Sequence, residues 1–294
     1  MNDENNQMNN ISSLFTKQGV ETLIDSVINL GKKLESAFLV IEKECQKLAT
    51  VDYDLMANRL IDVFVSIGYY DVLDNIKWPL YLITDTKFQE ELIQAYSNDS
   101  KDTETIKSLV FAYCTDEKIL KCKKVWENCT AIKEDRKPIL DEAIEMYING
   151  YYYSCTSLLM CQLYGIASDI VDISKKYNIQ LSEEDKNEIA EYYGIEKDQI
   201  DKEKGKLIQM TFVVDNKIMI WSGVANYLKS DILSSSESKK RWASQPLRNK
   251  ICHGDQLNFG TKEHALKSVL IIDLLVKLAC EIERVGKIGE KYGR

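Results

Sequence analysis

The sequence predicts an all-α protein, and three observations support this fold class. The 294 residues include only three prolines and thirteen glycines, the two residue types that interrupt helices most strongly. Leucine, isoleucine, lysine and glutamate are abundant, a composition typical of a mainly helical chain. In several segments the apolar residues recur at the three- and four-residue spacing of one helix face. We therefore expect a helical bundle as a C-terminal domain, preceded by a helical accessory region.

Residues 1–130 are predicted to form the accessory region. After a polar tail, the apolar residues between Val20 and Ile41 recur at helical spacing, which indicates one long amphipathic helix or two helices that break near Gly31. The apolar face of this segment either packs in the core, which we favour, or contacts a partner. Further helices are expected over residues 53–67, ended by Gly68, and over residues 87–96 and 103–113. Packing, sensing and partner binding are all compatible with such a region.

The eight cysteines are scattered singly along the chain and predict no metal site. The most closely spaced, Cys114, Cys122 and Cys129, include no CxxC pair and have no histidine nearby. The N-terminus lacks the charged and apolar segments of a signal peptide, so we expect a cytoplasmic protein whose reduced thiols mostly lie in the core. No apolar run reaches the ~18 residues of a membrane-spanning helix. We expect no metal, no cofactor and no membrane contact.

Residues 131–294 are predicted to form the helical domain. Its opening helices are expected over residues 139–149 and 151–175, with Gly150 between them, and its closing helix over residues 262–285, with Thr261 as N-cap. The part between residues 176 and 243 is less regular. Within it, residues 211–221 are compatible with a β-hairpin, but we favour a helix because the surrounding bundle is helical.

The strongest functional signal is the segment Ser244-Gln245-Pro246-Leu247-Arg248-Asn249-Lys250-Ile251-Cys252-His253-Gly254, which holds one of only two histidines. The pattern predicts a short helix with Ser244 as N-cap, Pro246 in the first turn and Gly254 at the end.

Three side chains of this short helix form a candidate phosphate site. Asn249 and His253 are four residues apart and therefore share a face, and the long side chain of Arg248 swings toward them. An imidazole moves protons near neutral pH, a guanidinium neutralises oxyanions, and an amide orients either group. This combination indicates chemistry on a phosphate.

The motif resembles the signature of the HEPN superfamily, in which an arginine, a polar residue and three further residues precede a histidine and a glycine. The helices expected over residues 139–165 and the apolar helix from Leu266 onward are similar to the opening and closing helices of such domains. The resemblance covers roughly residues 131–285, apart from the poorly matching middle. One residue departs from the pattern, because Tyr164, directly before Gly165, stands where many relatives carry an acid.

The resemblance implies a metal-independent endoribonuclease that works as a homodimer. In RNA the 2′-hydroxyl attacks the neighbouring phosphate, so catalysis needs proton transfer and charge stabilisation rather than a metal. His253 would be the general base or acid, Arg248 would hold the phosphate oxygens, and Asn249 would orient His253 or the phosphate. Many such proteins are toxins or anti-phage effectors held inactive by an antitoxin or a regulatory protein, a restraint that residues 1–130 would supply.

RNA binding would depend on local charge, because the net charge of −8 argues against a general nucleic-acid binder. Lys240, Arg241 and Lys250 are the candidate cations; a solvated helix surface is the alternative. Gln162 and Asp169 lie on one helix face and either line the cleft, replacing the acid absent at Tyr164, or satisfy local hydrogen bonds.

Two further features of the sequence allow more than one interpretation. The aromatic cluster Tyr147, Tyr151, Tyr152 and Tyr153 either stacks on bases or packs in the core or a dimer interface. His264, in the first turn of the closing helix, either helps at the site or, as we favour, is an exposed polar residue. The helix dipole is expected to lower its pKa.

The sequence allows comparison of the ribonuclease with two other functions. A catalytically inactive helical module for protein or nucleic-acid binding would use Arg248 in a buried ion pair and His253 as a core residue. A thiol enzyme built on Cys252 and His253 is disfavoured, because adjacent helical residues point about 100° apart.

Overall fold

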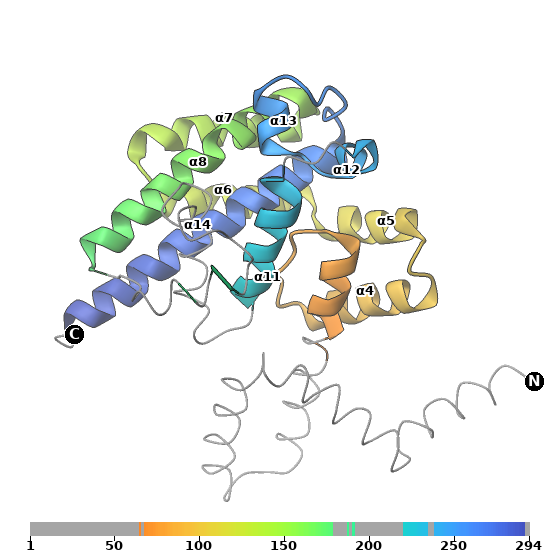
Figure 1. The fold of residues 1–294 in the computed structure, drawn as a ribbon, viewed down its shortest axis with the longest axis horizontal. Helices are drawn as coiled ribbons and strands as arrows, with labels where there is room; N and C mark the ends of the chain where they lie inside the picture. Colours follow the sequence, from red (N-terminus) through yellow and green to blue (C-terminus); the bar gives the residue numbers. More distant parts are fainter. Residues whose placement is uncertain are drawn as a thin grey trace, which may run out of the picture. The chain divides into compact units, whose positions relative to one another are not determined.

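The structure is a computed structural model that describes residues 68–178, 220–234 and 238–291, with isolated positions at 65, 187 and 190–191. All of these residues belong to one compact unit. Every regular element among them is helical, as Figure 1 shows, which confirms the all-α prediction for this part of the chain. The helices predicted over residues 20–41 and most of 53–67, and the segment 211–219, lie outside the described residues.

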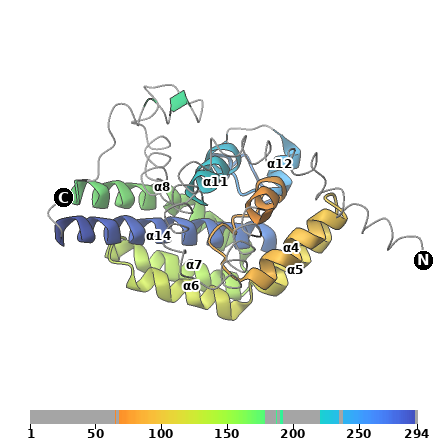
Figure 2. The same cartoon turned by 90° about the horizontal axis from the view of Figure 1, so that it is seen from below.

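Two long helices form the centre of the unit. They are α8 (Tyr152–Lys176) and α14 (Lys262–Lys291), which lie side by side and run in the same direction (Figures 1 and 2). Residues 264–276 of α14 are all buried, so this stretch is enclosed on every side. Because the two helices begin at the same end of the unit, the loop before α14 meets the start of α8.

Further helices cover this central pair. Helix α7 (Lys137–Ile148) packs on α8, and α6 (Asp116–Asn128) packs on α7 and α14. The indole of Trp126 in α6 is buried, and its Nε1 donates a hydrogen bond to Asp273 of α14 at 3.0 Å. Residue 130 thus lies between two helices of one core. The division into an accessory region and a HEPN-like domain stays a prediction.

Helices α4 (Thr86–Asn98) and α5 (Thr103–Tyr113) confirm the predictions at residues 87–96 and 103–113. Each begins after an aspartate that caps it. The Asp85 carboxylate accepts a hydrogen bond from the backbone N–H of Phe88, and that of Asp102 accepts one from Thr105. Such caps satisfy backbone donors that a helix start leaves unpaired.

Two local predictions differ from the structure: α14 continues to Lys291 instead of ending at residue 285, and Gly68 lies inside a helix. Gly68 does not end a helix, because residues 68–76 are helical and the chain turns at Lys77, whose φ is +57°. Tyr69, Val72 and Leu73 pack into the core at helical spacing and carry the helix past the glycine. Helix α6 was not predicted at all. Among the described helices, none has the length and apolar character required to cross a membrane.

Candidate functional site

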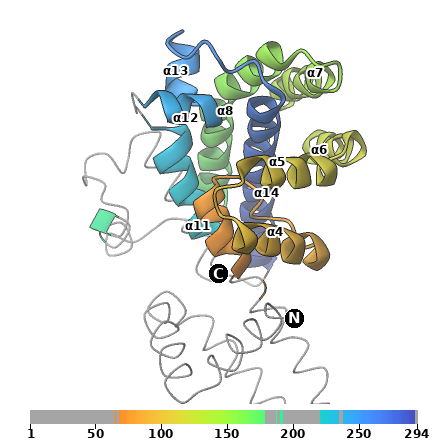
Figure 3. The same ribbon diagram turned by 90° about the vertical axis from the view of Figure 1, so that its right-hand side faces the viewer.

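The motif lies on a short helix, and the residues directly before this helix are not helical. Helix α11 (Ile220–Tyr227) continues into the π-helical turn η3 (Leu228–Ile232). Then come α12 (Lys239–Ser244) and α13 (Arg248–Cys252), and α13 packs on α8 (Figure 3).

The start of the motif helix was predicted wrongly. Ser244 is the last residue of α12, and its hydroxyl donates back to carbonyls of that helix. Gln245 is extended, with φ −130° and ψ 136°, because the residue before a proline is driven out of the helical region. Helix α13 therefore begins only at Arg248, two residues after Pro246.

The predicted end of the motif helix is confirmed. Its C-cap is His253, and Gly254 follows with φ +79°, a left-handed conformation that glycine adopts without steric cost.

Two buried glutamines hold the motif segment in place. The Gln256 Oε1 accepts a hydrogen bond from the Leu247 backbone, and its Nε2 donates to the carbonyls of Trp242 and Gln245, at 2.7–3.0 Å. The side chain of Gln245 accepts from the Tyr227 hydroxyl and donates to the Lys77 carbonyl. Neither glutamine was predicted as a functional residue, because their partners come from other elements and leave no local pattern.

The Arg248 guanidinium is held by two neighbours. Its Cζ lies 3.9 Å from the centre of the Tyr164 ring, a cation–π contact between α13 and α8. Its Nη1 donates to the Asn249 side-chain oxygen at 3.1 Å. Its Nε is buried and has no hydrogen-bond partner among the described residues. The residue that departs from the HEPN pattern, Tyr164, therefore contacts the motif arginine directly.

His253 is exposed at the end of α13, one turn after Asn249. Its backbone N–H donates to the Asn249 carbonyl at 3.0 Å, which fixes the two residues on one face of the turn. Arg248, Asn249 and His253 thus lie together on one short element, with the imidazole reachable from solvent.

The candidate cations differ in how they are placed. The Lys250 ammonium lies 3.3 Å from the Asp255 carboxylate and near the Trp242 ring. Arg241 donates to the Ser230 carbonyl and the Ser234 hydroxyl. Lys240 is exposed on α12. Two of the three predicted cations therefore have partners within the chain, which reduces the positive charge they offer to RNA.

Gln162 and Asp169 bind Arg136, an arginine that precedes α7. The Arg136 Nε donates to Asp169 at 2.9 Å, and its Nη1 donates to the Gln162 side-chain oxygen at 2.6 Å. Asp169 is only 2% exposed. Gly165 makes room for this cluster, because a Cβ there would overlap the Arg136 guanidinium. The structure thus places Gln162 and Asp169 in an ion-pair cluster within the chain and gives them no contact with the motif side chains.

His264 is buried, so the prediction of an exposed side chain is wrong. A carbonyl only accepts, so the imidazole Nε2 donates to the Trp242 carbonyl at 3.0 Å, and Nδ1 accepts from the Thr261 hydroxyl at 2.6 Å. Burial lowers the pKa of His264, as the sequence predicted, although for a different reason. The neutral ring anchors α12 to the first turn of α14, which Thr261 caps as predicted.

The predicted aromatic cluster divides between core and surface. Tyr147 is buried, and Tyr152 packs beside it. Tyr151 and Tyr153 are 62% and 55% exposed. The Tyr153 hydroxyl donates to the Leu257 carbonyl at 3.2 Å, which joins the start of α8 to the loop after the motif.

Cys252 contacts another cysteine at the α13–α8 interface. Its Sγ lies 3.5 Å from that of Cys161. Burial raises the pKa of Cys252 to about 11, so at neutral pH it is a thiol and a poor nucleophile. This supports the rejection of a thiol enzyme at the motif.

No family model, no curated protein and no solved structure matches the chain. The function is therefore argued from the motif and its geometry.

Proposed function

We propose that the protein is a metal-independent endoribonuclease with Arg248, Asn249 and His253 as its catalytic residues. The observation that supports this most directly is the exposed imidazole of His253 on the same short element as an arginine–asparagine pair. An accessible proton-transfer group beside a cation is what phosphodiester cleavage requires.

RNA supplies its own nucleophile to this site. His253 removes the proton from the 2′-hydroxyl, which attacks the phosphorus, and Arg248 stabilises the negative charge that gathers on the non-bridging oxygens. The 5′-oxygen leaves with a proton, giving a 2′,3′-cyclic phosphate and a 5′-hydroxyl. One histidine does not easily serve both sides of the phosphate, so the proposal includes a homodimer that brings two motifs together.

The contact with Tyr164 leaves the charge of Arg248 available for a phosphate. A carboxylate beside the guanidinium would neutralise it, whereas an aromatic ring attracts a cation without cancelling its charge. The ring therefore orients Arg248 and preserves its attraction for an anion.

The test is RNA cleavage in the presence of EDTA. We expect the wild type to cleave RNA and to leave cyclic phosphate ends, and we expect His253→Ala and Arg248→Ala to lose at least a hundredfold in rate. Asn258→Ala, an exposed amide in the following loop, is the matched control and keeps full activity. Cleavage that survives in His253→Ala, or that requires a divalent metal, contradicts the proposal.

The second candidate function is a catalytically inactive module that binds protein or nucleic acid. The internal partners of Arg241 and Lys250 favour it, because both cations are already engaged within the chain. A folded wild-type protein that leaves varied RNAs intact, while one of them binds and His253→Ala leaves that affinity unchanged, supports the module over the enzyme.

We further propose that the ribonuclease is a growth-arresting effector of anti-phage defence, restrained by an antitoxin, a regulatory protein or residues 1–130. This part rests on the resemblance to HEPN toxins alone.

A further inference from the structure

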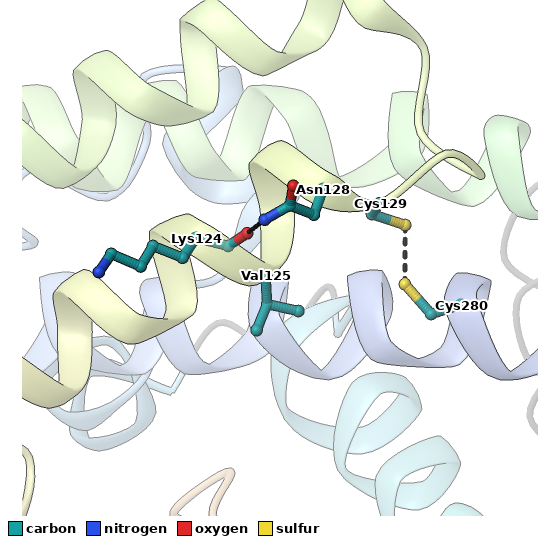
Figure 4. Close-up of a pocket in the computed structure, with 5 residues that line it drawn as sticks. All are labelled: Lys124, Val125, Asn128, Cys129 and Cys280. Carbon is teal, nitrogen blue, oxygen red and sulfur yellow. Dashed lines mark hydrogen bonds between the residues drawn. The ribbon is translucent and has the colours of Figure 1, made fainter.

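A pair of cysteines lies between α6 and α14, away from the motif. Cys129 is the C-cap of α6 and Cys280 lies in α14, and Figure 4 shows their sulfur atoms pointing toward each other. The Cys280 thiol donates a hydrogen bond to the Cys129 sulfur, with 2.8 Å between the two Sγ atoms. A disulfide bond measures about 2.0 Å, so a small movement brings the sulfurs to bonding distance.

The pair is reachable from the surface. Both cysteines line an open depression of about 400 Å³, together with Lys124, Val125 and Asn128 of α6 (Figure 4). Cys129 itself is only 3% exposed, whereas Cys280 is half-buried. The depression admits a small reagent.

The surroundings of Cys129 make it a good nucleophile. The hydrogen bond from Cys280, helped by the backbone N–H groups of Ala131 and Ile132, lowers the pKa of Cys129 to about 7 against the opposing effect of burial. Glu283 of α14 raises it, and Lys287 also faces the sulfur. The lowered pKa raises the share of Cys129 that is thiolate at neutral pH, and the thiolate is the reactive form.

We propose that Cys129 and Cys280 form a redox-active dithiol that reacts with low-molecular-weight disulfides and closes a covalent link between α6 and α14. The Cys129 thiolate attacks one sulfur of R–S–S–R, forms a mixed disulfide and releases R–S⁻. Cys280 then gives up its proton, and its sulfur attacks Cys129 and expels the second R–S⁻. Two protein thiols are oxidised, and one small disulfide is reduced to two small thiols.

The chain contains an internal comparison for this reaction. Cys161 and Cys252 are both exposed, and their sulfurs are 3.5 Å apart. Burial raises the pKa of Cys252 to about 11, so Cys252 holds little thiolate at neutral pH. If thiolate content decides the reaction, the less exposed pair reacts first.

The experiment uses the reduced full-length protein. It is incubated with oxidised glutathione at pH 7, quenched with N-ethylmaleimide, digested and mapped by mass spectrometry. We expect a Cys129–Cys280 link to form at least tenfold faster than a Cys161–Cys252 link, and at an unchanged rate in Cys161→Ser. A Cys161–Cys252 link that forms first overturns the proposal. The proposal also fails if the folded protein forms no Cys129–Cys280 link within the time that all thiols of the urea-unfolded protein react.

Two substitutions at Cys280 test its part in the reaction. Cys280→Ser keeps a hydroxyl donor for Cys129, so we expect a trapped mixed disulfide on Cys129 and a pH midpoint for its alkylation near that of the wild type. Cys280→Ala removes the donor, and we expect the midpoint to rise by at least one pH unit. Circular dichroism checks that both variants fold. Equal midpoints in the two variants contradict the role assigned to Cys280.

Discussion

Tyr164 shows how one side chain orients a charged residue of the candidate site. Its ring lies 3.9 Å from the Arg248 guanidinium carbon, on the neighbouring helix α8. The contact pre-orients a flexible cation, which otherwise loses rotamer entropy on binding a phosphate. On the proposed function, we therefore expect a different residue at position 164 to change the affinity of Arg248 for a phosphate more than it changes the fold.

We expect Tyr164→Leu to cleave RNA roughly fivefold more slowly than the wild type, because a cation–π contact of about 1 kcal/mol is lost. Tyr164→Phe keeps the ring and stays within about twofold. Single-turnover cleavage rates in EDTA measure both. A leucine variant as fast as the phenylalanine variant would show that the ring does not position Arg248 for the reaction.

His264 predicts a pH-dependent contribution to stability. Its pKa in the folded protein is lowered from the usual 6.5, so the unfolded chain binds the proton more tightly. Stability rises with pH wherever the unfolded state holds more protons. The contribution of the neutral ring is therefore complete above pH 6.5 and is lost as the pH falls below that value.

The variant His264→Gln tests this pH dependence. Its side-chain amide keeps a donor for the Trp242 carbonyl but does not titrate. We expect urea unfolding of the wild type to lose more stability between pH 7 and pH 5 than unfolding of this variant. Equal losses would mean that His264 is not a buried neutral ring.

At the scale of elements, the segment from α12 to α13 is held by side chains rather than by regular structure. Helix α13 has five residues and is too short to be stable by itself. The two buried glutamines and His264 supply the hydrogen bonds that fix it. The position of the motif thus depends on residues outside the motif.

Gln256→Leu removes three hydrogen bonds and leaves the Leu247 N–H and the Trp242 and Gln245 carbonyls without this partner. We expect the free energy of unfolding to fall by about 2–4 kcal/mol, because each buried polar group left unpaired costs about 1 kcal/mol or more. Cleavage activity should fall as well, since the motif loses its anchor. Urea denaturation measures the free energy of unfolding. Asn258→Leu, at an exposed position of the same loop, is the control. A variant with wild-type stability refutes the anchoring role of Gln256.

The sequence predicts some elements well and others poorly, for physical reasons. Helices α5 and α14 carry their start signals locally, in Asp102 and Thr261, and both begin where predicted. Pro246 fits either the first turn of a helix or a break before it. The extended Gln245 before the proline and the buried partners of Gln245 and Gln256 together favour the break. The segment that holds Cys114, Cys122 and Cys129 predicts no metal site, and the helix α6 within it was not predicted.

At the scale of the whole molecule, contacts between distant segments decide what the site contains. The Tyr164–Arg248 contact depends on how α13 packs on α8, which no local pattern reports. The net charge of −8 is also a property of the whole chain, and it argues against general nucleic-acid binding even though single cations lie near the motif. The residue types of the motif were visible in the sequence, whereas the partners of Arg241, Lys250, Gln162 and Asp169 required the structure.

The proposed effector role makes a prediction for the living cell. Expression of the wild type in a bacterial host should slow growth, whereas Arg248→Ala, expressed to the same level, should allow growth close to that of an empty vector. The reason is that the variant keeps the helices of the core but lacks the cation that stabilises the reacting phosphate. Growth curves and sequencing of RNA ends that carry a 5′-hydroxyl measure the two effects, and Asn258→Ala is the matched control. Equal growth of wild type and Arg248→Ala, with active enzyme in the purified wild type, removes the growth-arrest role and leaves the ribonuclease standing. Equal growth with no cleavage by either protein removes both the growth-arrest role and the ribonuclease activity.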